Sequence, residues 1–160
     1  MKLRDVSIAA LLADQLSKFL ILHYFVMGQS ITVIPGYLYL TYIQNPGAAF
    51  GFMANTPAWA RIPFFLVITL GAGLIVYAYQ RFIPKEKVLQ RFALGLIWGG
   101  AMGNFVDRVV YRRVVDFIDV RFHQHQWFPY IFNVADSCIT VGLTLLIITY
   151  WREHRSQRSR

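Results

Sequence analysis

Residues 6–27 read VSIAALLADQLSKFLILHYFVM, and this stretch decides the fold. It is long enough to cross a bilayer as a helix, which takes roughly 20 residues, yet it carries Asp14 and Lys18 near its middle. Residues four apart lie on the same side of a helix, so each charge offsets the other at a depth where either alone is costly. The stretch predicts a transmembrane helix whose ion pair is buried inside a bundle of helices.

The composition of the whole chain is that of a membrane protein. Of its 160 residues, 56% are hydrophobic and 15% are charged, whereas a soluble domain usually has about 25% charged residues. The basic residues flank apolar runs and form no dense patch, so the net charge of +8 indicates membrane topology and no nucleic-acid partner. We expect one integral membrane domain over residues 1–160.

Four apolar segments are predicted to span the membrane as helices, at residues 6–27, 62–82, 88–109 and 135–151. The fourth is the shortest. Of the 16 Lys and Arg residues, ten lie near the termini and between the second and third segments. Five lie in or beside the other two loops, and Lys18 lies within the first segment. Because basic residues accumulate on the cytoplasmic side, we expect both termini in the cytoplasm and the loops of residues 28–61 and 110–134 outside. Polar residues 14, 15, 17 and 18 interrupt the first segment, so it is a retained helix and no cleaved signal peptide.

Both outer loops are predicted to carry structure of their own. Residues 37–42 (YLYLTY) are strand-forming residues that follow a Pro-Gly turn signal and predict a short sheet, or cradle, at the membrane surface. Residues 54–59 predict a short interfacial helix anchored by Trp59. The second loop carries an aromatic cluster suited to the same interface: Phe122, Trp127, Phe128 and Tyr130. The expected fold class is an all-α membrane protein with four transmembrane helices and a small extracytoplasmic β-sheet.

The third segment combines a small-residue face with a polar outer end. The glycines on that face, each four residues apart, are Gly95, Gly99 and Gly103. Small residues at this spacing let another helix approach closely. Asn104, Asp107 and Arg108 follow, and for this patch capping or ion pairing is at least as well supported as catalysis.

Asp116, in the loop after the third segment, and Asp136, at the start of the fourth, are candidate reacting groups. Asn133 precedes Asp136 by one helical turn. If the two outer helix ends meet, the aspartates form a facing pair that shares one proton. One carboxylate then activates water while the other donates a proton, as in an aspartic protease. Separate structural carboxylates are the alternative, because the 20 residues between them fix no distance.

The remaining reactive side chains give weak signals. Cys138 lies two residues from Asp136, but a small packing residue inside a helix is a better interpretation than a nucleophile. His123 and His125 form a His-x-His pair in a loop, and no HExxH spacing is present. No metal and no cofactor are expected, so chelators should leave any activity unchanged. Asp119 has no assigned role.

Five short blocks carry a resemblance to a known family. They are DQLSK (residues 14–18), NPGAAF (45–50), GGAMGNFVDR (99–108), VVDF (114–117) and FNVADS (132–137). In this order they resemble the signature blocks of the bacterial lipoprotein signal peptidases, or signal peptidase II. They cover essentially the whole chain, and no signature position departs from the family's pattern.

The resemblance implies a four-helix membrane aspartic endopeptidase of the bacterial inner membrane, with its active site near the outer face. Its substrate would be a prolipoprotein, cleaved just before a cysteine that carries diacylglycerol. By position the catalytic pair falls on Asp116 and Asp136. Substrate-binding roles fall on Asn45 and Arg108, with hydrogen bonds around the pair from Asn104 and Asn133. Asp14, Lys18 and Asp107 match positions that support the structure.

Two other functions stay open at this point. One is a small ion- or proton-coupled transporter that uses Asp14, Lys18 and Asp107 as a relay, although the second and fourth segments offer no polar line and no inverted repeat. The other is a non-catalytic membrane scaffold. Prolipoprotein and membrane lipids are the expected partners, and four spans could enclose a site within a single chain.

Overall fold

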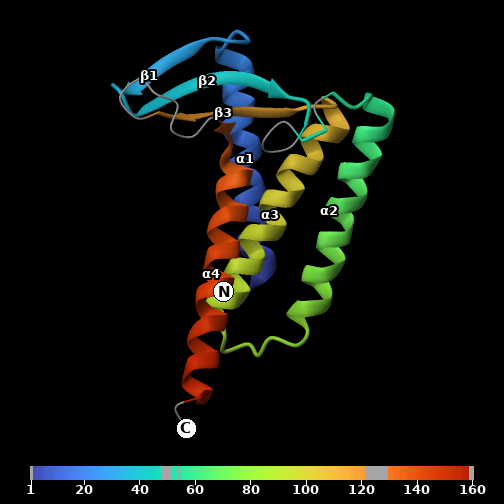
Figure 1. Ribbon diagram of the computed structural model, residues 1–160, viewed down its shortest axis with the longest axis vertical. Helices are drawn as coiled ribbons and strands as arrows, with labels where there is room; N and C mark the ends of the chain where they lie inside the picture. Colours follow the sequence, from blue (N-terminus) through green and yellow to red (C-terminus); the bar gives the residue numbers. More distant parts are fainter. Residues whose placement is uncertain (1, 48–51, 54, 122–129, 159–160) are drawn as a thin grey trace.

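The computed structural model of the chain describes residues 2–47, 52–53, 55–121 and 130–158, with side chains up to residue 155. Within these residues four long helices lie side by side, and a four-stranded sheet lies across one end of them (Figure 1). The helices are α1 (Leu3–Tyr24), α2 (Ala58–Gln80), α3 (Val88–Val110) and α4 (Val134–Arg158). The strands are β1 (Ser30–Ile34), β2 (Leu38–Asn45), β3 (Val114–Val120) and β4 (Ile131–Phe132).

Helices form at all four predicted segments, but the lengths differ from the prediction. The fourth, predicted to be the shortest, has 25 residues, because the helix continues into the polar residues beyond Trp151. By length and hydropathy, three helices in the described part of the chain can cross a membrane: α1, α2 and α4. The 23-residue α3 is less apolar because it carries Gln90, Arg91 and the polar patch at its outer end.

Helix α3 is the centre of the bundle and contacts α1, α2 and α4. Its glycines make these contacts close: a methyl group on Gly99 would lie 2.5 Å from the Ser7 carbonyl oxygen of α1, and one on Gly103 would meet the Asp14 carboxylate. The predicted small-residue face is therefore the α1–α3 interface. Close backbone approach at small residues is how membrane helices pack, because lipid provides no hydrophobic driving force between them.

The sheet is antiparallel throughout, in the order β1-β2-β3-β4. The first outer loop supplies β1 and β2, as predicted. The second outer loop supplies β3 and β4, so the prediction that Asp116 lies in a loop was wrong: it lies in β3, opposite Ile43 of β2. The β-branched and aromatic residues of Val114–Val120 are a strand signal that could have revealed this.

The outer loops were also predicted to contain a short interfacial helix and an aromatic cluster. No separate interfacial helix is found near residues 54–59 in the described part of the chain, because residues 55–57 form a turn and Trp59 lies in the first turn of α2. Residue 54 and most of the predicted aromatic cluster lie outside the described residues, as do His123 and His125.

An apolar cluster joins the sheet to the bundle. Ile21 near the end of α1 packs with Tyr42 of β2 and with Val115 and Phe117 of β3, all of them buried. Because Val115 and Phe117 point into this cluster, the alternation of side chains along a strand turns Asp116 to the opposite face. This packing fixes the face of β3 that carries Asp116.

Candidate active site

Asp116 and Asp136 come from different elements and line the same cavity. Asp116 belongs to β3 and is only 1% exposed, whereas Asp136 lies in the first turn of α4 and is half-buried. The cavity has a volume of about 670 Å³. The polar residues that line it include Asn45, Asn104, Arg108, Asp116, Asp136 and Ser137. The two aspartates therefore line one cavity, but they lie on a strand and a helix and not on the ends of two helices.

Asn133 binds the carboxylate of Asp116 and the backbone of Asp136. Its side-chain Nδ2 donates a hydrogen bond to Asp116 Oδ1 at 2.6 Å. Its Oδ1 accepts the backbone N–H of Asp136 at 2.9 Å, which caps the N-terminus of α4. Asn133 is completely buried, so its amide is held in place by the fold.

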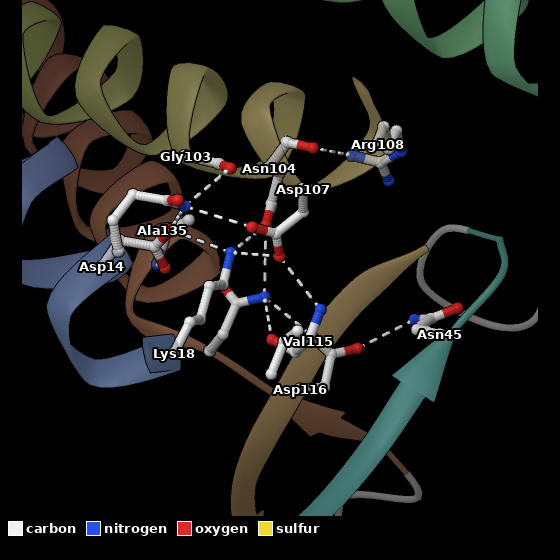
Figure 2. Close-up of polar contacts among 12 residues, drawn as sticks. Asp14, Lys18, Asn45, Gly103, Asn104, Asp107, Arg108, Val115, Asp116 and Ala135 are labelled. Atoms are coloured by element: carbon white, nitrogen blue, oxygen red, sulfur yellow. Dashed lines mark hydrogen bonds and ion pairs between the residues drawn. The ribbon is translucent and has the colours of Figure 1, made fainter. Parts of the chain in front are cut away.

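Each aspartate also accepts a hydrogen bond from an asparagine of another element. Asn45, at the end of β2, donates to Asp116 Oδ2 at 3.0 Å (Figure 2). Asn104 of α3 donates to Asp136 Oδ1 at 2.7 Å. The antiparallel pairing of β2 with β3 positions Asn45, because Asn45 lies opposite Val114, two residues from Asp116.

The pKa of Asp116 is raised from 3.8 to about 7. Burial is the largest cause, since it disfavours the charged form, and the negative charge of Asp136 adds to it. The hydrogen bonds from Asn45 and Asn133 oppose the rise. Near neutral pH the pair can therefore hold one proton, which is the state that acid–base chemistry by two carboxylates requires.

Arg108 lies at the edge of the cavity and is held in a fixed place. Its Nη1 donates to the Asn104 carbonyl oxygen at 3.1 Å, and its Nη2 donates to the Gly47 carbonyl oxygen at 3.3 Å. Its guanidinium carbon lies 4.4 Å from the centre of the Phe65 ring of α2, within the range of a cation–π contact. The cation therefore borders the cavity that the two aspartates line, and backbone carbonyl oxygens and an aromatic ring hold it there.

The predicted ion pair of Asp14 and Lys18 is confirmed and proves to be part of a larger cluster. Lys18 Nζ lies 2.8 Å from Asp14 Oδ2 and 2.9 Å from Asp107 Oδ2 (Figure 2). The ion pairing predicted for the polar patch of α3 is formed by Asp107, and its partner is Lys18 of α1. Asp107 also accepts the backbone N–H of Val115 at 3.0 Å, which ties β3 to the bundle.

Two buried or half-buried polar residues, Gln15 and Asp119, have structural roles that were not predicted. Gln15 donates to Asp14, to Asp107 and to the Gly103 carbonyl oxygen, which links α1 to α3. Asp119, for which no role was predicted, is 1% exposed. It accepts a hydrogen bond from Thr41 at 2.8 Å and forms an ion pair with Arg121. The contacts of these two residues have no sequence signal beyond residue type. Cys138 is half-buried on α4 and is not among the residues that line the cavity.

Comparisons with known proteins show the family of the chain. The family model described as Signal peptidase (SPase) II matches residues 6–152. The chain is 41% identical over 159 residues to the lipoprotein signal peptidase of Syntrophotalea carbinolica, with 96% of each chain covered. It is 44% identical to that of Desulfitobacterium hafniense, with 91% of this chain and 89% of the relative covered.

A solved structure of a bacterial membrane enzyme has a similar fold. It superimposes with a TM-score of 0.84 at 31% identity and covers 97% of this chain and 90% of its own. Neither the transporter nor the scaffold interpretation accounts for these matches. The chain belongs to the signal peptidase II family and is a membrane peptidase that cleaves the signal peptides of lipoproteins.

Proposed function

We propose that Asp116 and Asp136 form the catalytic pair of this peptidase. The observation that carries the proposal is that both carboxylates line one cavity, where the side-chain amide of Asn133 binds the Asp116 carboxylate and the backbone N–H of Asp136. The raised pKa of Asp116 supports it further, since this carboxyl can then hold a proton near neutral pH.

The reaction needs one ionised and one protonated carboxyl. The ionised carboxylate accepts a proton from water, and the water oxygen attacks the carbonyl carbon of the scissile peptide bond. The protonated carboxyl donates its proton to the carbonyl oxygen as the tetrahedral intermediate forms. The intermediate then collapses: the carbon–nitrogen bond breaks, and the leaving nitrogen takes up the proton that the pair holds. One hydroxyl of the intermediate returns its proton to the pair as the carbonyl re-forms, so the pair is again singly protonated.

Asn45 and Arg108 are proposed to hold the backbone of the substrate. Both side chains line the cavity and they come from different elements, Asn45 from β2 and Arg108 from α3. An extended peptide in the cavity offers carbonyl oxygens that a guanidinium N–H can bind, and N–H groups that an amide oxygen can bind.

The substrate is proposed to be a prolipoprotein whose cleavage-site cysteine carries diacylglycerol. The cavity supports this because apolar residues form much of its wall, among them Ile139 and Val141 of α4. Val141 is 50% exposed, and α4 is apolar enough to cross a membrane. The cavity thus borders a surface that can face lipid, where acyl chains are accommodated without entering water.

We further propose that all four helices span the bacterial inner membrane and that both termini are cytoplasmic. The start of α1, the end of α4 and the α2–α3 connection lie on the side of the bundle away from the sheet (Figure 1). Ten of the basic residues lie in or beside these segments in the sequence. The less apolar α3 is shielded by its contacts with the other three helices.

One chain provides the lining of the cavity, so a monomer suffices for activity.

The test is cleavage of a synthetic prolipoprotein peptide with a diacylglyceryl cysteine by the purified protein. Asp116→Asn and Asp136→Asn should each lower kcat on the order of 10²–10⁴-fold, the contribution of a general acid or base. Asp5→Asn, at an exposed acid on α1, is the matched control and should keep full activity. Wild-type activity in either folded cavity variant would disprove the catalytic assignment, and equal cleavage of the peptide without lipid would disprove the lipid requirement.

A further inference from the structure

Lys18 is a buried cation with every proton engaged. Its ammonium group lies 2.8 Å from Asp14, 2.9 Å from Asp107 and 3.0 Å from the Oδ1 atom of Asn104. Lys18 is 2% exposed and the two aspartates are fully buried. The two carboxylates accept two of its three N–H groups, and the neutral amide oxygen of Asn104 accepts the third.

That third bond fixes the orientation of the Asn104 side chain. An ammonium group donates three hydrogen bonds and accepts none, so it excludes the amide orientation in which Asn104 Nδ2 faces Lys18. Asn104 Oδ1 therefore faces Lys18, and Nδ2 faces the opposite way, where it donates to Asp136 Oδ1 at 2.7 Å. A second donor, Asn133 Nδ2 at 3.2 Å from the same oxygen, enforces this orientation.

The two asparagines beside the pair are thus set by different groups. The Asn133 amide is oriented by the backbone N–H of Asp136 at the start of α4, so the helix itself supplies the constraint. The Asn104 amide lies in the interior of α3, where backbone N–H groups are already bonded within the helix. Its orientation is set by side chains of other elements. Asn133 donates to the same oxygen, and Lys18 of α1 is the donor that cannot become an acceptor (Figure 2).

We propose that Lys18 is a positioning residue for the peptidase reaction: through Asn104 it holds an N–H donor on Asp136. The inference rests on the proposed catalytic role of Asp116 and Asp136. It assigns to Lys18 a role in the chemistry that is separate from its ion pair with Asp14, because Lys18 contacts Asn104 through a proton that it does not share with Asp14.

The charge of Lys18 also reaches the pair directly. It lowers the pKa of Asp116, in opposition to burial and to Asp136. The charged groups that interact with Lys18 come from α1, α3 and β3, and they are Asp14, Asp107 and Asp116. Asp136 of α4 is linked to Lys18 through Asn104. Removal of the cation should therefore raise the pKa of Asp116, whereas removal of Asp14, which is of opposite charge, should not.

The experiment compares Asp14→Asn with the double variant Asp14→Asn, Lys18→Met. The double variant loses one charge of each sign, so the buried cluster keeps the net charge of the wild type. The single variant removes a partner of Lys18 but leaves its bond to Asn104. We expect the double variant to have at least a tenfold lower kcat than Asp14→Asn, a KM within about twofold, and an alkaline limb of the pH profile displaced to higher pH.

A purely structural role for Lys18 would lower the unfolding temperature without displacing the pH profile of the folded fraction. Equal kcat and equal pH profiles in the two folded variants would overturn the inference. If Asp116→Asn were active, the catalytic assignment itself would fail. Loss of activity in Asp116→Asn, together with an unchanged double variant, would overturn only the role of Lys18.

A measurement on the wild-type protein keeps the inference testable if the double variant does not fold. In protein with ¹⁵N-labelled asparagine, the side-chain N–H resonances of Asn104, assigned by comparison with Asn104→Ser, should titrate together with the pair. Resonances that stay constant while activity changes with pH would overturn the inference, because they would show that Nδ2 does not donate to Asp136.

Discussion

Asn133 and Asp136 cap each other at the N-terminus of α4. The Asn133 side chain accepts the backbone N–H of Asp136 at 2.9 Å, and the Asp136 carboxylate accepts the backbone N–H of Asn133 at 3.4 Å. This is the reciprocal pattern of a capping box, with Asn and Asp in place of Ser and Glu. A proposed reacting group therefore also stabilises the helix that carries it, so its backbone is fixed to the fold.

Asn133 both caps α4 and donates to Asp116, so substitutions at this position should change the stability and the activity independently. Asn133→Ser keeps a good capping residue, whereas Asn133→Ala loses the cap and should be less stable than the serine variant by about 1 kcal/mol. Both variants lose the amide donor to Asp116, so both should have a much lower kcat. Thermal unfolding in detergent and peptide cleavage provide the two measurements. Full kcat in Asn133→Ser would contradict the role of the amide.

Activity is predicted to fall as the pH rises through about 7. The pKa of Asp116 is raised to about 7, so this carboxyl keeps its proton under mildly acidic conditions and loses it above that value. The pair then carries two charges and has no acid to protonate the scissile carbonyl oxygen. The measurement is kcat/KM against pH, which reports apparent values of the pair. Activity that increases steadily into the alkaline range would contradict a shared proton.

Asp136→Asn is predicted to lower the pKa of Asp116. The substitution removes a negative charge that raises this pKa, although burial, the larger cause, remains. We therefore expect a value between 3.8 and about 7. Infrared titration with ¹³C-labelled aspartate can measure it, with the Asp116→Asn, Asp136→Asn double variant as the reference spectrum. An unchanged pKa would mean that the two carboxylates do not interact.

Two glycine-to-alanine substitutions are predicted to have opposite effects on stability. A methyl group on Gly103 would meet the Asp14 carboxylate at the α1–α3 interface, and such overpacking costs about 1–3 kcal/mol. A methyl group on Gly71 of α2 would have no neighbouring atom within 4 Å, so Gly71→Ala should stabilise the helix by about 0.5–1 kcal/mol. Unfolding midpoints in detergent test both. Equal midpoints would show that the α1–α3 contact tolerates a larger residue.

The helical part of the fold could be predicted because its signals are local. Long apolar runs predict helices wherever they occur, and the spacing of Asp14 and Lys18 places both on one side of α1. The strand β3 could have been predicted from Val114–Val120, but its pairing with β2 could not. That pairing joins segments from the two separate outer loops, and the bulge between Leu40 and Ile43 shifts its register in a way that no local pattern fixes.

The sequence by itself determined that this is a membrane protein with a buried ion pair, and its blocks indicated the family. Only the tertiary structure decided which groups meet: Asp116 with Asn45 across the sheet, and Asp136 with Asn104 across the helices. It also showed that Lys18 binds Asp107 and Asn104 as well as Asp14. The physical reason is that helix periodicity relates only residues within about one turn of each other, whereas the site is formed by contacts between elements that packing alone brings together.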